Sequence, residues 1–211
     1  MKALTYEIIK AAYDRKGYAF FEDGDFNLNI GGIRVQNSVS NHFDDVIFVA
    51  YKLSGIKMLH CYNATTDPGK HWLLNPLNVK GTAIMVPGQY RGAYKIGLHG
   101  KSSRLGPYKA LEQVKPMKYV RDNNRDNILD FSLYRDPEKA KVHVFWDNIK
   151  SNLHRASKWK IVQWVGMYSA ACQVIQSPDD FRKLMQLCEN GRSEWGNSFT
   201  YTLFETKEII Y

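Results

Sequence analysis

One histidine and one cysteine stand at a spacing that suits nucleophilic catalysis. His154 precedes Cys172 by 18 positions, and a basic and aromatic segment lies between them. A thiolate is the strongest nucleophile that an ordinary side chain offers near neutral pH, and an imidazole within hydrogen-bond reach activates it. The pair therefore predicts acyl transfer, in which Cys172 attacks a carbonyl carbon and His154 moves the proton.

The residues around this pair form two short motifs. The histidine lies in Asn152-Leu153-His154-Arg155-Ala156, and the cysteine ends Ser169-Ala170-Ala171-Cys172. This arrangement resembles the L,D-transpeptidase (YkuD-like) catalytic domain family, in which a histidine on a strand is followed, at about this distance, by Ser-His-Gly-Cys. Ala170 and Ala171 depart from that pattern, because the family has His and Gly there. The resemblance covers mainly residues 60–175.

The resemblance implies a role for each of these positions. Cys172 would be the nucleophile and His154 the base, and the backbone carbonyl of Arg155 would orient the imidazole. The backbone amides of Ala171 and Cys172 would stabilise the oxyanion, provided that φ at Ala171 is negative. Ser169 would serve either as a hydrogen-bond donor or as a brace for the turn. The candidates for contact with the substrate are Trp164, Tyr168, Gln173 and His99.

A peptidoglycan stem peptide is the substrate that the resemblance implies. The reaction would pass through a thioester and end on an amine or on water, with no cofactor. The same motifs resemble phage-encoded relatives, which implies a protein that acts at the cell wall during lysis or within the virion. The alternative is a non-catalytic protein on the same fold, either peptidoglycan-binding or a structural part of a tail or baseplate. A papain-type hydrolase is disfavoured, because that type places its cysteine before its histidine.

The cysteine count and the N-terminal segment bear on where the protein is made. Three cysteines are too few, and odd in number, for a disulfide scaffold, which suits synthesis in a reducing cytoplasm. Residues 1–16 lack the apolar segment and cleavage site of a secretory signal. Cys61 and Cys188 lie in apolar patterns and are expected in the core, so Cys172 is predicted to be the most reactive thiol.

The charge of the chain favours anionic partners. The net charge is +8, but the Lys and Arg residues are scattered and no nucleic-acid-binding motif accompanies them. An acidic cell-wall polymer is therefore a better candidate partner than nucleic acid. No apolar run reaches the length of a membrane span. Residues 122–127 lack the Gly and the closing Glu of a calcium loop, so no metal site is predicted.

Most elements around the motifs are predicted to be strands. His154 is expected to end a strand over residues 149–154, where the apolar content lies in Ile149 and Leu153, so its truncation should cost little core. Thr66-Asp67-Pro68-Gly69 loosely matches a Thr-Pro-x-Gly turn of the L,D-transpeptidase family. Other segments with the alternating or buried pattern of strands are residues 26–30, 46–51, 56–62, 83–86, 94–99, 142–146 and 199–204.

Two helices are expected to flank these strands, near residues 4–16 and 178–190. Ser177 is a suitable N-cap for the second helix, and Gly191 is its expected end. The pattern predicts a mainly β (α+β) fold, and the resemblance implies a YkuD-like β-sandwich or curved mixed sheet. We expect one domain over residues 1–211, in which residues 1–55 and 177–211 are additions to the resembling core.

Overall fold

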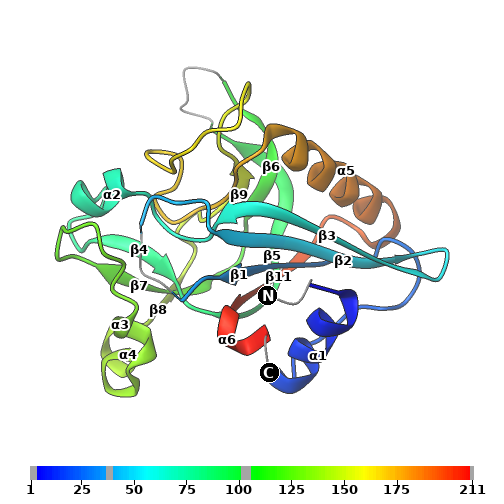
Figure 1. The fold of residues 1–211 in the computed structure, drawn as a ribbon, viewed down its shortest axis with the longest axis horizontal. Helices are drawn as coiled ribbons and strands as arrows, with labels where there is room; N and C mark the ends of the chain where they lie inside the picture. The colour runs from blue at the N-terminus through cyan, green and yellow to red at the C-terminus, as the bar shows by residue number, and fades with distance from the viewer. Residues whose placement is uncertain (1–3, 37–39, 101–105, 210–211) are drawn as a thin grey trace.

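The architecture is a β-barrel with a smaller sheet beside it, seen in a computed structural model that describes residues 4–36, 40–100 and 106–209 (Figure 1). The mainly β, α+β class predicted from the sequence is confirmed. Eight strands close the barrel, and all neighbours are antiparallel except the parallel pairs β1–β11 and β9–β10. In order around the barrel the strands are β1 (Asn29–Arg34), β11 (Phe199–Glu205), β5 (Gly88–His99), β6 (Tyr108–Gln113), β9 (Leu153–Arg155), β10 (Gln173–Ile175), β3 (Ile56–Thr65) and β2 (Asp45–Leu53).

The barrel draws its strands from the whole length of the chain. β1 and β2 come from the first 55 residues, and β11 comes from the last 35, yet all three pair directly with one another or with β3 and β5. The segments before residue 56 and after residue 176 therefore supply strands of the barrel itself, and the barrel is not confined to residues 60–175.

The second sheet packs beside the barrel with its own apolar cluster. Its strands are β4 (Thr82–Met85), β7 (Met117–Asp122) and β8 (Phe145–Asp147). Leu73, Ile84, Val120, Leu129 and Phe131 form the cluster. Three short helices accompany this sheet, namely α2 (Lys70–Leu74), α3 (Ser132–Arg135) and α4 (Pro137–His143).

Helices cover the barrel from two sides. α1 (Tyr6–Lys16) packs on the outer face of β1, β2 and β11, and α5 (Pro178–Trp195) packs its apolar side against the interior cluster. Gly191 does not end α5, which continues to Trp195. A Cβ at Gly191 would lie 3.0 Å from the carbonyl oxygen of Phe26, so the glycine lets the helix approach that loop. α6 (Thr206–Ile209) follows β11.

Two other predictions are wrong. Val142 lies in α4 and not in a strand, because Asp136 caps this helix by accepting from the amides of Glu138 and Lys139. Cys61 is exposed and not in the core. Its neighbour Tyr62 faces the interior cluster, and strand alternation therefore turns Cys61 outward.

Candidate functional site

The two predicted catalytic residues lie on neighbouring parallel strands. β9 and β10 pair with His154 opposite Val174. The amide of Gln173 donates to the carbonyl oxygen of Asn152 at 2.9 Å, which extends the ladder to the level of Cys172. Cys172 lies directly before the strand next to that of His154, and two residues before Val174, the residue opposite His154. The Cα atoms of His154 and Cys172 are therefore about 8 Å apart.

Both side chains belong to the outer face of the barrel. Leu153 and Ile175 are members of the interior cluster. Because neighbours on a strand point to opposite faces, His154 and Cys172 share the other face. The pairing thus brings the predicted base and the predicted nucleophile to one side of two adjacent strands.

A backbone carbonyl orients the His154 ring. Its Nδ1 lies 2.7 Å from the carbonyl oxygen of Arg155, which is the group predicted for this role. A carbonyl oxygen can only accept, so Nδ1 carries the proton and Nε2 holds the lone pair. Within the described ranges, Nε2 is buried without a hydrogen-bond partner. The imidazole is therefore in the tautomer that a general base needs.

His99 and Tyr108 enclose the imidazole. The His99 ring stacks on that of His154, with centroids 3.8 Å apart, and its Nδ1 lies 3.1 Å from Nδ2 of Asn152. The Tyr108 hydroxyl lies 3.3 Å from His154 Nδ1. Burial, reinforced by the neighbouring His99 and opposed by the Arg155 carbonyl, lowers the pKa of His154 to about 3. The base is consequently neutral throughout the physiological pH range.

The Cys172 thiol is half-buried and faces a backbone carbonyl. Its Sγ donates toward the carbonyl oxygen of Lys150 at 3.8 Å, and it makes no hydrogen bond to His154. Burial raises the pKa of the thiol to about 11, although the amide of Asn152 acts in the opposite direction. Attack would therefore require the side chain to turn from Lys150 toward His154 and to lose its proton during the attack.

The candidate oxyanion donors are the backbone amides of Ala171 and Cys172. In the described part of the chain neither amide donates a hydrogen bond. Ala171 is not among the residues with positive φ, so an alanine in place of the family's glycine keeps the amide without strain. Its carbonyl accepts from the Ser151 hydroxyl at 2.6 Å, and its side chain packs with Ala83 and Tyr119 of the small sheet.

Ser169 has the contacts of a brace. Its side chain is fully buried, and its hydroxyl donates to the carbonyl oxygen of Cys172 at 2.8 Å. Its own carbonyl accepts from the amide of Gly69 at 2.9 Å. Of the two predicted roles, bracing the turn fits better, because the hydroxyl is already committed to a backbone carbonyl.

Replacement of Gly69 should disturb the cysteine loop. A Cβ at this position would lie 2.2 Å from the carbonyl oxygen of Gly166, so Gly69→Ala must push the two backbones apart. We expect the free energy of unfolding to fall by about 1–3 kcal/mol and any turnover at Cys172 to decrease. Thermal melting and a turnover assay measure the two effects. Gly55→Ala meets nothing within 4 Å, but the φ of 78° at Gly55 strains an alanine, so this variant should lose stability without losing turnover; loss of turnover in both variants would contradict the steric explanation.

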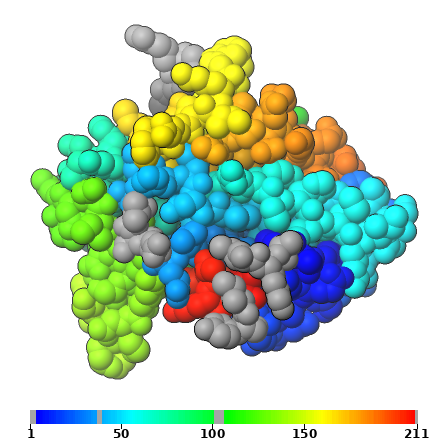
Figure 2. Space-filling model, in the orientation of Figure 1, coloured from blue at the N-terminus to red at the C-terminus, as the bar shows by residue number. Residues whose placement is uncertain are grey.

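The predicted substrate contacts lie in three different environments. His99 is at the site, stacked on His154. Trp164 and Tyr168 are exposed on the loop between β9 and β10, which projects at the top of the molecule (yellow to orange in Figure 2). Gln173 is fully buried, and its Oε1 accepts from the Tyr201 hydroxyl at 2.7 Å. Strand alternation directs it into the barrel, which corrects the prediction that it contacts substrate.

Tyr108 and Asn152 also contribute to the site but were not singled out from the sequence. Asn152 precedes His154 by two residues, and strand alternation could have placed the two side chains on one face. Tyr108 comes from β6, and its contact depends on the pairing of β6 with β9. No local pattern in the sequence announces that contact.

Neither a metal centre nor a membrane-spanning helix is found in the described part of the chain. No three His, Cys, Asp or Glu side chains converge there as metal ligands. No helix among these residues is long and apolar enough to cross a bilayer. Comparison of the chain with protein-family models, curated proteins and solved structures finds no match.

Proposed function

We propose that this chain is a cysteine-dependent enzyme of acyl transfer or hydrolysis, with an L,D-transpeptidase-like fold, that acts on peptidoglycan stem peptides. The pairing of β9 with β10 is the observation that supports it most directly. It puts Cys172 and His154 on one face, and the carbonyl of Arg155 holds the proton of the imidazole on Nδ1. A nucleophile, a base and a group that orients the base are the parts that such chemistry requires.

The proposed reaction runs in two steps. Sγ of Cys172 attacks the carbonyl carbon of a peptide bond, the thiol proton passes to Nε2 of His154, and the amides of Ala171 and Cys172 receive the oxyanion. The C–N bond breaks, and the leaving amine takes the proton from His154, so that a thioester remains on Cys172. An amine or water then attacks the thioester, loses its proton to His154, and the thiolate leaves and recovers that proton.

We also propose that the protein acts at the cell wall, as a component of a phage virion. The net charge of +8 supports an anionic partner such as a wall polymer.

A non-catalytic wall-binding protein is the second candidate. It is favoured by the environment of the thiol, whose pKa is raised to about 11 and whose proton is directed at the Lys150 carbonyl. Ala170 stands in place of the family's histidine, and this difference also favours a non-catalytic protein.

Covalent labelling of Cys172 distinguishes the two candidates. Cys61 is exposed and would react with general alkylating agents, so the experiment uses the Cys61→Ser protein. We expect a carbapenem to acylate Cys172 and to leave Cys188 unmodified, because Cys172 is partly exposed and shares a strand face with His154, whereas Cys188 is buried. Mass spectrometry of the peptides locates the adduct.

The control is Cys61→Ser combined with Cys172→Ala, which should remain unlabelled. If Cys172 is inert to the carbapenem and to purified stem peptides, while the protein sediments with cell-wall sacculi, the binding function replaces the catalytic one.

A further inference from the structure

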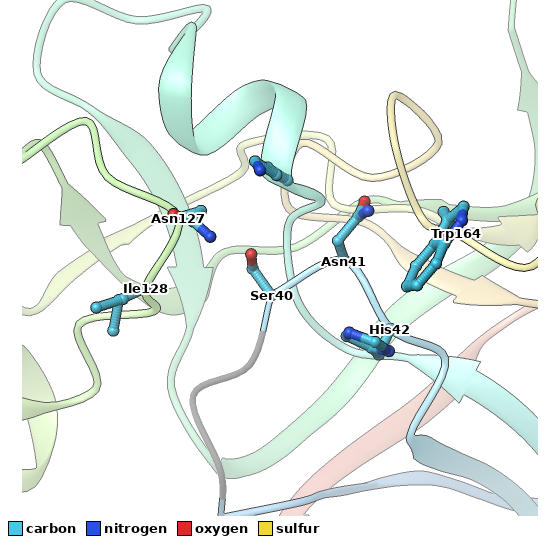
Figure 3. Close-up of a pocket in the computed structure, with 7 residues that line it drawn as sticks. Ser40, Asn41, His42, Asn127, Ile128 and Trp164 are labelled. Atoms are coloured by element: carbon cyan, nitrogen blue, oxygen red, sulfur yellow. The ribbon is translucent and has the colours of Figure 1, made fainter.

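A cavity of about 540 Å³ opens beside the loop that ends in Cys172 (Figure 3). This volume lies within the range of about 300–1,000 Å³ that is typical of small-molecule sites. Trp164 of that loop forms one wall, and Asn127 and Ile128 lie across from it, with Ser40 and Asn41 between. The cavity therefore shares a structural element with the candidate catalytic cysteine.

The Trp164 wall presents an aromatic surface. The His42 ring meets the indole edge to face, with centroids 5.0 Å apart and planes at 78°. The Trp164 side chain is still 48% exposed. The indole is thus held from one side and is available to a ligand on the other.

Asn41 connects the loop that carries Trp164 to the opposite part of the cavity by hydrogen bonds. Its carbonyl accepts from the amide of Val165 at 3.0 Å, and its Oδ1 accepts from the amide of Gly166 at 2.6 Å. Asn41 adopts φ 76°, a left-handed conformation that asparagine tolerates better than most residues. Since Oδ1 is occupied, Nδ2 is the part of the carboxamide that can donate to a ligand.

The remaining lining is polar and carries little charge. Ser40 supplies a hydroxyl, and the carboxamide of Asn127 provides both a donor and an acceptor. Lys70 adds an ammonium group. Trp164 and Ile128 are the apolar members of the lining.

We propose that this cavity binds a saccharide of N-acetylated hexosamine units. A pyranose ring has a face of C–H groups that can lie on an indole, and a rim of hydroxyls that needs both donors and acceptors. The carboxamides of Asn41 and Asn127 suit an acetamido group, which itself has one N–H and one carbonyl. A nucleotide fits less well, because Lys70 is the one permanently charged cation among the described lining residues.

The choice of an N-acetylated sugar rests on the proposed function, since stem peptides are attached to a glycan of such sugars. The β9–β10 loop carries Trp164 and leads directly into Cys172. A glycan held in the cavity would keep its attached peptide near the thiol and raise its local concentration there.

Binding of chitotriose, the trisaccharide of N-acetylglucosamine, tests the assignment by calorimetry on the full chain. Trp164→Ala should weaken binding by about tenfold, and Trp164→Phe by much less, because an aromatic face remains. Trp159→Ala is the matched control, since Trp159 lies on the same loop, is 74% exposed and does not line the cavity. Absence of chitotriose binding, equal loss in the two alanine variants, or equally tight binding of cellotriose would overturn the assignment.

The same measurement on Cys172→Ala separates this inference from the proposed function. Because binding needs no thiol, we expect Cys172→Ala to retain the affinity of the wild type for chitotriose. If the wild type processes stem peptides but does not bind chitotriose, the saccharide site is wrong and the enzymatic proposal stands. If chitotriose binds at Trp164 and Cys172 is never acylated, the enzymatic proposal fails and the saccharide site stands.

Discussion

Replacement of His154 by glutamine is expected to reduce turnover of stem peptides by about 10²- to 10⁴-fold, the usual contribution of a general acid–base group. Glutamine can still donate to the Arg155 carbonyl, but its amide cannot take the thiol proton. Purified muropeptides and mass spectrometry of the products measure the effect. Full turnover in His154→Gln would identify another residue as the base.

Glutamine is a better test than alanine because His154 is more buried than its sequence suggested. Its side chain is 3% exposed and stacks on His99, so His154→Ala leaves a cavity and an unpaired neighbour. His60→Gln is the matched control: His60 is half-buried on β3, four residues before the Ala64 that pairs with β10, and should leave turnover unchanged. Melting temperatures of both variants report whether the fold is intact.

The pH dependence follows from the same burial. An ordinary histidine base loses activity below a pKa of about 6.5. Since the pKa of His154 is lowered to about 3, its imidazole stays neutral well into the acid range. We therefore expect kcat/KM to hold its neutral-pH value below pH 6, until His154 is protonated.

Arg34→Met is expected to lower the free energy of unfolding by about 3–5 kcal/mol, which is a large part of the stability of a domain. The Arg34 guanidinium is fully buried, lies 2.8 Å from Oδ1 of Asp67, and donates to the Met85 carbonyl at 2.6 Å. The variant keeps the apolar stem but leaves the Asp67 carboxylate buried without its cation. Chemical denaturation followed by fluorescence measures the loss.

The control variants separate this effect from general loss of charge. Lys57→Met removes an exposed ion pair with Glu7 and should change stability little, because such pairs are screened by water. Arg34→Met combined with Asp67→Leu should recover part of the loss, since the Asp67 carboxylate is then no longer buried without its cation. If Arg34→Met unfolds at the same denaturant concentration as the wild type, the buried pair is not a stabilising element.

Arg34 also connects stability to the candidate site. It joins β1 to the turn that contains Asp67 and Gly69, and to β4 of the small sheet. The amide of Gly69 in turn donates a hydrogen bond to the carbonyl oxygen of Ser169, three residues before Cys172. A partly destabilised Arg34 variant should therefore loosen the loop of Cys172 before the whole barrel unfolds.

The sequence by itself determined the features that depend on near neighbours. The residue pattern placed β2, β3 and β11 close to their observed bounds, through a continuous apolar run for β2, and Ser177 begins α5 by accepting from the amide of Asp180. The contact of His154 with the Arg155 carbonyl is between adjacent residues, so the resemblance of this short motif to a known family was sufficient to imply it. Local periodicity reports these features because each arises within a few residues of backbone.

Only the tertiary structure decided which distant segments meet and which strand face is buried. Closure of the barrel joins β1 to β11 and β9 to β10, and no local pattern encodes such pairings. Alternation separates Cys61 from Tyr62 and Cys172 from Gln173, but it does not say which member of each pair points inward. The stacking of His99 on His154 likewise depends on strands β5, β6 and β9 lying side by side. That contact, together with burial, makes His154 a neutral base, because desolvation and a neighbouring imidazole both disfavour its charged form.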